Sequence, residues 1–313
     1  MKAHASYIAL TYWDVAGSSL FLFLAGILTV VLKLGMAKTL LIRAVRMVAQ
    51  LIAIGFVLKF IFTATSPWIT LLAAAVMVSF ASREVLSRQE RQLSGLWRFG
   101  LGPSAMLITG ALALIYTLTV LLQPDPWHSP RYALPLFGMI LGNTMTGVAL
   151  GLNAITAAIT REKTAIEARL LLGQTRWEAL RPFAARTLRT AMTPILNAMA
   201  ASGVISLPGM MTGQILSGVP PVEAVKYQLM IMFTIGGVVG LGVIAAVFAN
   251  IWRLTDPRHR LRPDRLEPVK PGRKIKRPGP GGGGGMGMGM GGGGGGAGAG
   301  PGGGKGQKRP PAG

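Results

Sequence analysis

The chain has 313 residues, of which 50% are apolar and only 14% are charged, whereas a soluble domain carries about a quarter charged residues. The net charge of +21 is concentrated beside the apolar runs and in the C-terminal tail, which favours contact with anionic lipid and argues against nucleic-acid binding. The sequence has no cysteine, which excludes disulfides, thiolate metal sites and thiol catalysis. We therefore expect an integral membrane protein that binds the lipid bilayer and no nucleic acid.

Residues 1–14 carry charged and aromatic side chains where a cleaved signal peptide would have a short apolar core, so we expect the first apolar run to be a retained anchor. Seven apolar runs follow along the chain, at residues 15–32, 44–63, 67–82, 103–122, 133–159, 190–207 and 228–252. A helix needs about 20 residues to cross a bilayer, and the third and sixth runs are short or interrupted. The sequence predicts an all-α fold, a polytopic bundle of about seven membrane-spanning helices.

The basic residues of the connecting loops predict the orientation. The three loops on one side carry four, four and seven basic residues, whereas the other side carries four in all. Loops rich in lysine and arginine stay in the cytoplasm, which places the N-terminus outside and the C-terminus inside. We divide the chain into a membrane domain over residues 1–256, with a cytoplasmic loop at 160–189, and a basic, Pro- and Gly-rich tail over 257–313 that is expected to be disordered.

The fifth apolar run contains Asn143, a side-chain amide inside a long apolar span. Asn143 needs a hydrogen-bond partner inside an apolar span, for which Gln50 and Asn197 are candidates. Met139 lies four residues earlier and therefore on the same helical face. Asn143 either bridges helices or faces a translocation path, and the sequence leaves both roles open.

The loop at 160–189 has the pattern of a short amphipathic helix. Apolar residues recur at helical spacing from Ala165 to Leu171, among charged residues. Gly173 would end this helix by adopting a left-handed conformation, and a second amphipathic stretch begins near Trp177. On periodicity alone, the loop also fits an interfacial hairpin that only connects two spans.

The stretch SLPGMMTGQIL, at residues 206–216, interrupts the apolar pattern without adding a charge. Pro208 breaks helical hydrogen bonding, and we expect a bend that is buried within the bundle. Met210, Met211 and Gln214 either fill gaps between helices or face the translocation path near its outer end. Two glycine pairs have the spacing of close helix packing, namely Gly138 with Gly142 and Gly209 with Gly213.

Catalytic motifs are missing from the sequence. It contains no complete phosphate-binding loop, nucleophile elbow or zinc-binding helix. We expect this chain to perform no covalent chemistry, to have no ATPase activity of its own and to bind no cofactor.

Three segments resemble known transporter sequences. EARLLLGQTRWEAL resembles the glutamate–alanine loop of ABC transporter permeases, in which a short cytoplasmic helix docks on the ATPase subunit; Glu167, Ala168 and Gly173 match that pattern, and Arg169 departs from it. GMILGNTMTG and SLPGMMTGQILSGVPPVEAVKYQLMIMF resemble the FetB-like permeases, which are linked to iron export in bacteria and, in plants, to aluminium tolerance.

This resemblance implies a multi-pass permease of a bacterial inner membrane that exports iron or another metal. Two copies would form a homodimer, and each copy would dock one ATPase subunit, which binds the ATP. The predicted coupling residues are Glu167, Ala168 and Gly173, and the predicted path residues are Met139, Asn143, Met210, Met211 and Gln214.

Other functions stay open at this stage. The spans offer iron(II) almost no imidazole or carboxylate ligand, so an ABC exporter of an organic solute such as a nucleotide sugar is an alternative. A passive channel or carrier, and a scaffold that recruits partners through its basic tail, are two more. The metal ligands, if any, are unknown from the sequence.

Overall fold

The computed structural model describes residues 11–63, 66–95, 97–256, 258 and 260–268. Its helices in chain order are α1 (Tyr12–Val31), α2 (Ala37–Thr63), α3 (Pro67–Ser87), α4 (Trp97–Tyr116), α5 (Pro130–Arg161), α6 (Lys163–Leu171), α7 (Arg176–Ala201), α8 (Gly209–Leu216) and α9 (Pro221–Leu254). A π-helical segment, Thr117–Leu122, extends α4. Two short strands, β1 (Arg91–Leu93) and β2 (Leu266–Pro268), pair antiparallel. The predicted all-α fold is confirmed.

Six of the described helices are long and apolar enough to cross a membrane: α1, α2, α3, α4 with its π-helical extension, α5 and α9. The chain is therefore a multi-pass helical membrane protein. Helix α7 contains most of the sixth predicted run but does not meet this criterion, because four arginines precede that run in the helix. The seventh span and the orientation of the chain stay predictions.

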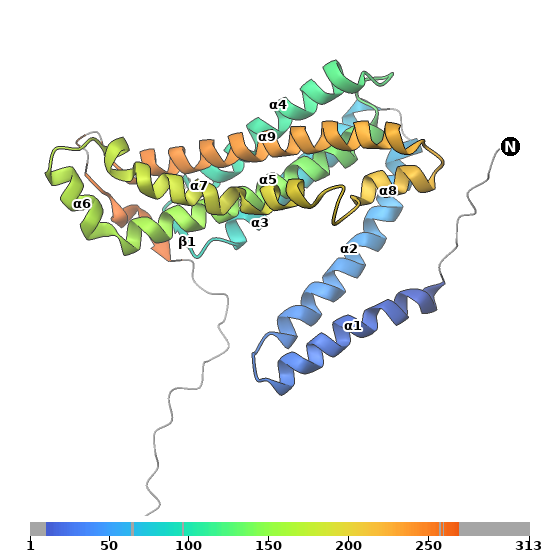
Figure 1. The fold of residues 1–313 in the computed structure, drawn as a ribbon, viewed down its shortest axis with the longest axis horizontal. Coiled ribbons are helices and arrows are strands. Elements are labelled where there is room, and N and C mark those ends of the chain that lie inside the picture. Colours follow the sequence, from blue (N-terminus) through green and yellow to red (C-terminus); the bar gives the residue numbers. More distant parts are fainter. Residues whose placement is uncertain (1–10, 64–65, 96, 257, 259, 269–313) are drawn as a thin grey trace, which may run out of the picture. The chain divides into compact units, whose positions relative to one another are not determined.

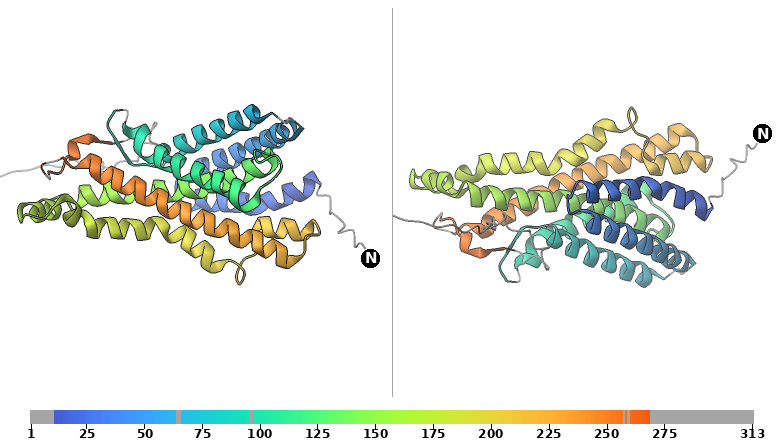
Figure 2. Two further views of the ribbon diagram at one scale, coloured as in Figure 1. Left: turned by 90° about the horizontal axis from the view of Figure 1, so that it is seen from above. Right: turned by 90° about the horizontal axis from the view of Figure 1, so that it is seen from below.

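Helix α5 is central, because it packs against α3, α4, α7 and α9 (Figures 1 and 2). Two glycines of α5 face α9. A Cβ atom at Gly147 would lie 2.9 Å from Cγ1 of Val239, and one at Gly151 would lie 3.2 Å from Cγ1 of Val243. The missing side chains let the two backbones approach closely, as small residues four apart do in membrane helices.

The glycine pairs expected from the sequence do not make such contacts within this chain. A Cβ atom at Gly142, Gly209 or Gly213 would meet no heavy atom within 4 Å. Gly138 would meet only the flexible end of Met77, at 3.2 Å. The spacing was right, but the pair that uses it inside the chain, Gly147 with Gly151, lies about two and a half turns further along α5.

Helices α1 and α2 form a hairpin that buries few of its residues (Figure 1). Helix α1 packs mainly on α2, and α2 makes few contacts with α5. The hairpin's exposed side chains are mostly leucine, isoleucine, valine and phenylalanine. An apolar surface of this kind suits contact with lipid.

The chain breaks between α7 and α8, as Pro208 predicts. Thr175 and Glu178 form a capping box that starts α7, and Pro221 starts α9. The bend at residues 202–208 is not buried within the chain, contrary to the sequence-based expectation: Val204 is 91% exposed and Ile205 82%. None of the described helices covers these apolar side chains.

The start of the predicted tail is ordered. Thr255 and Leu261 form an isolated antiparallel β-bridge, and residues 266–268 pair with β1. The N–H groups of Arg260 and Arg258 donate to the carboxylate of Asp256, which lowers the pKa of Asp256 below its ordinary value. We expected this stretch to lack structure, but Leu261 is buried in the core and anchors it. Residues 269–313, including the Gly-rich tract, lie outside the described residues.

Candidate functional site

The first candidate site is α6, which connects α5 to α7 at the end of the bundle opposite α8 (Figures 1 and 2). Gly173 ends α6 as predicted, with φ +87°, a left-handed conformation that glycine adopts without steric cost. Its N–H donates to the carbonyl of Leu170 at 3.1 Å. The short amphipathic helix predicted from the loop at 160–189 is confirmed.

The two faces of α6 differ sharply in burial. Ile166 is fully buried in the core and fixes the helix to the bundle. Leu171 and Leu172, at the end of the helix, are 88% and 83% exposed. Large apolar side chains this exposed at a loop tip are typical of a surface that another protein covers.

The predicted coupling residues lie beside this apolar pair. Glu167 is half-buried and forms an ion pair with Lys163, with 3.6 Å between Oε1 and Nζ. Ala168 is exposed on the same short helix. A small side chain at this position leaves the helix surface accessible to a partner. All three predicted residues, Glu167, Ala168 and Gly173, therefore fall within one turn of the exposed leucines.

The second candidate site is a cavity of about 210 Å³ at the opposite end of the bundle. It lies between α5, α8 and α9. Three of the five predicted path residues line it, namely Met139, Met210 and Gln214. The Oε1 atom of Gln214 is buried and has no hydrogen-bond partner among the described residues. A buried acceptor without a partner is costly, which makes this atom a candidate ligand-binding group.

The other two predicted path residues do not line this cavity. Asn143 is exposed, and its Nδ2 donates to the carbonyl of Met139 in the same helix, at 2.8 Å. Its amide thus bonds within α5, whereas the sequence suggested Gln50 or Asn197 as partners. Met211 is half-buried on α8 and is not among the residues that line the cavity.

Sequence reasoning missed several residues of this cavity. Tyr227, Met230 and Ile231 line it from α9, at i, i+3 and i+4. This spacing marks one helical face and was a detectable signal. Arg131 and Tyr132 line it from the start of α5.

The cavity offers thioether sulfurs and an amide oxygen as donor atoms. No group of three or more His, Cys, Asp or Glu side chains that would hold a metal ion occurs in the described part of the chain. Thioethers favour soft cations, whereas iron(II) favours imidazole and carboxylate ligands. The site therefore suits loose binding of a metal, or binding of a metal that already carries its own ligands.

Comparison with known proteins places the chain in a family. The pattern of the uncharacterised protein family UPF0014 matches residues 12–254. The chain belongs to this family. A UPF0014 membrane protein of Synechocystis is 37% identical over 69% of this chain and 82% of the relative.

Two further UPF0014 relatives have names that describe a role. The "probable iron export permease protein FetB" of Escherichia coli is 30% identical over 73% of this chain and 86% of the relative. The protein ALUMINUM SENSITIVE 3 of Arabidopsis thaliana is 32% identical over 74% of this chain and 83% of the relative. The predicted FetB-like family is thus confirmed. No solved structure gives a significant match to the chain.

Proposed function

We propose that this chain is the permease subunit of an ABC exporter that moves iron or another metal, driven by ATP hydrolysis in a separate subunit. The observation that carries the proposal is that α6 is anchored in the bundle on one side and exposes apolar side chains at its tip. Its buried side is anchored by Ile166, and its tip presents Leu171 and Leu172 to the surroundings. The name of the relative FetB, a "probable iron export permease protein", supports both the permease role and the cargo.

The position of α6 suits mechanical coupling. It packs against both α5 and α7, and these two helices lead away from it along the bundle. A push on the tip of α6 would therefore reach α5, which carries Met139 at the far cavity. In this proposal two copies of the chain pair, each docks one ATPase subunit, and ATP binds only to that partner.

The cavity also supports a second cargo class. Arg131, Tyr132 and Tyr227 line it together with Gln214. Aromatic rings stack on planar or sugar groups, and a guanidinium pairs with an anionic group, so this set suits an organic solute such as a nucleotide sugar. A passive channel would also use the cavity but would have no need for the exposed tip of α6.

The test is transport by the chain together with the ATPase that co-purifies with it. In sealed vesicles, we expect iron to move only when both subunits and ATP are present. Movement of an organic solute alone would favour the second cargo class. Iron flux that continues at full rate without the ATPase would contradict the proposal and indicate a channel.

A further inference from the structure

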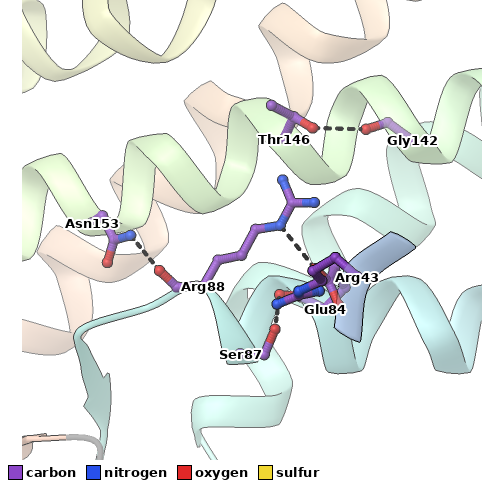
Figure 3. Close-up of polar contacts among 7 residues, drawn as sticks. All are labelled: Arg43, Glu84, Ser87, Arg88, Gly142, Thr146 and Asn153. Atoms are coloured by element: carbon purple, nitrogen blue, oxygen red, sulfur yellow. Dashed lines mark hydrogen bonds and ion pairs between the residues drawn. The ribbon is translucent and has the colours of Figure 1, made fainter. Parts of the chain in front are cut away.

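A cluster of charged side chains joins α2 to α3 (Figure 3). Arg43 and Arg46 lie in the first half of α2, Glu84 lies in the last turn of α3, and Arg88 caps the end of α3. Arg43 is about 9 Å along α2 from its first residue. The cluster borders a cavity of about 300 Å³ between α2, α3 and α5, which Gln50 also lines.

The charges of this cluster do not balance. A single carboxylate oxygen, Oε1 of Glu84, lies 3.5 Å from Nη1 of Arg43 and 3.2 Å from Nε of Arg88. Arg46 also lines the cavity, and the ion pairs found among the described residues include none for it. Three guanidinium groups therefore share one carboxylate, which leaves a charge of +2.

The α3 side of the cavity is held in place by α5. Asn153 of α5 donates from Nδ2 to the carbonyl of Arg88 at 2.6 Å, and its Oδ1 accepts from the N–H of Glu90 at 3.0 Å (Figure 3). These two bonds attach the end of α3 to α5. The backbone of Arg88 therefore has little freedom, and its guanidinium pairs from there with Glu84, which lines the cavity. The α3 wall of the cavity is thus preorganised.

The surroundings of the cavity are apolar and open. Phe80 lines it and is 58% exposed, and Val45, next to Arg46, is 61% exposed. Both helices are candidate membrane spans. An unbalanced positive charge among lipid-facing side chains needs an anion at the same depth, and such an anion must tolerate apolar neighbours.

We propose that this cavity is a specific binding site for the phosphate group of an anionic phospholipid. The guanidinium groups of Arg43 and Arg46 would hold the phosphate oxygens, and the acyl chains would cover the exposed side chains around Phe80. Arginine suits this role because its planar fork pairs two donors with two phosphate oxygens. Basic pockets between membrane helices bind lipid headgroups in this way.

The test measures lipid retention by native mass spectrometry on the full chain in detergent. Phosphatidylglycerol and phosphatidylcholine with the same acyl chains are titrated separately. We expect tighter binding of phosphatidylglycerol. Arg43→Gln/Arg46→Gln should weaken it about 25-fold, at about fivefold for each basic residue removed near an anionic group. Equal retention of the two lipids by the unmodified chain would overturn the proposal.

Two matched variants separate a specific site from general charge. Arg181→Gln/Arg189→Gln removes the same charge from exposed positions of α7 and should leave phosphatidylglycerol binding unchanged. Glu84→Gln removes the carboxylate that competes for the guanidinium groups and should strengthen binding, a gain that misfolding cannot produce. Equal weakening by both arginine pairs, or weaker binding in Glu84→Gln, would overturn the site.

A final arm identifies the source of the phosphate. Inorganic phosphate is added at millimolar concentration to the chain already loaded with phosphatidylglycerol. We expect the lipid to stay bound, because its acyl chains contribute contacts that free phosphate lacks. Complete displacement would mean that the cavity takes a soluble phosphate and that the lipid assignment is wrong.

Discussion

At the scale of single residues, the closest approach of α5 and α9 depends on Gly147. Replacing it with leucine would drive a side chain into Val239 and Val243, whose nearest carbons lie 2.9 and 3.0 Å from the site of a Cβ atom. We expect Gly147→Leu to lower the free energy of unfolding by about 1–3 kcal/mol, the usual cost of overpacking.

Thermal unfolding of the purified protein in detergent measures this effect. Gly237→Leu is the matched control, since Gly237 is an exposed glycine of α9 with no heavy atom within 4 Å of its Cβ position. Equal melting temperatures for the two variants would show that the α5–α9 contact does not depend on Gly147.

Gln214 should show opposite effects on stability and on transport. Its buried Oε1 atom has no partner among the described residues, so Gln214→Leu would remove an unsatisfied acceptor and keep the protein at least as stable. If the amide binds cargo at the cavity, efflux per inserted molecule should fall. The measurement pairs a melting curve with vesicle efflux.

Met211→Leu is the control on the same helix, because the structure places Met211 outside the cavity lining. It should change neither property. A Gln214→Leu variant that transports like the parent would remove the cavity amide from the path.

At the scale of elements, α6 should act as a docking helix through its exposed tip. Leu171→Asp/Leu172→Asp places two carboxylates where an apolar groove would receive leucine. Because both side chains are exposed, folding should be unaffected, while co-purification of the ATPase should fall at least tenfold, since each buried leucine contributes about 1.5–3 kcal/mol.

Thr164→Asp supplies the control, since Thr164 is an exposed residue at the other end of α6. The ratio of ATPase to permease after affinity purification is the measurement. Unchanged ratios in the leucine variant would mean that α6 is a connector.

Helix positions followed from the sequence, whereas the contacts between helices did not. Periodicity and Gly173 predicted α6, and Pro208 and Pro221 predicted the breaks around α8. Pairs of glycines four residues apart occur more than once in α5. Only the contact with Val239 reveals that the pair beginning at Gly147 is the one that packs closely against another helix.

The candidate cavity was predictable in part for the same reason. Met139, Met210 and Gln214 were singled out by residue type, but Tyr227 and Met230 join them only through the arrangement of α9 beside α8. The ordered residues 260–268 were missed because the average composition of that stretch is basic and proline-rich. Its two core contacts, Leu261 and Leu266, change the average composition of the stretch too little to reveal that it is ordered.

At the scale of the whole molecule, the polar side chains left exposed by one copy of the chain point to a second copy. Asn143 is exposed in the middle of α5, and Asn197 is exposed near the end of α7. Amides facing lipid are costly, so they should face another subunit or a watery path. We expect a homodimer in which the face of α5 around Asn143 approaches its equivalent.

The chain has no cysteine, so a single introduced cysteine reports on one position. Asn143→Cys should form a disulfide-linked dimer when membranes are oxidised. Phe21→Cys, on the 78% exposed lipid-facing side of α1, should stay monomeric at the same abundance. Crosslinking from Phe21→Cys alone would place the subunit contact on α1 and contradict this arrangement.

The four arginines of α7 bear on how the protein is made. After Arg189 only 12 residues of this helix remain, and they include Pro194 and Asn197. A segment of this kind would not partition from the translocon into lipid alone, because it is too short and too polar to match the hydrocarbon thickness. Helix α7 packs on both α5 and α9 in the finished fold. The entry of α7 into the bilayer should therefore wait until α9 has been synthesised. Insertion of α7 then depends on a helix that leaves the ribosome after it.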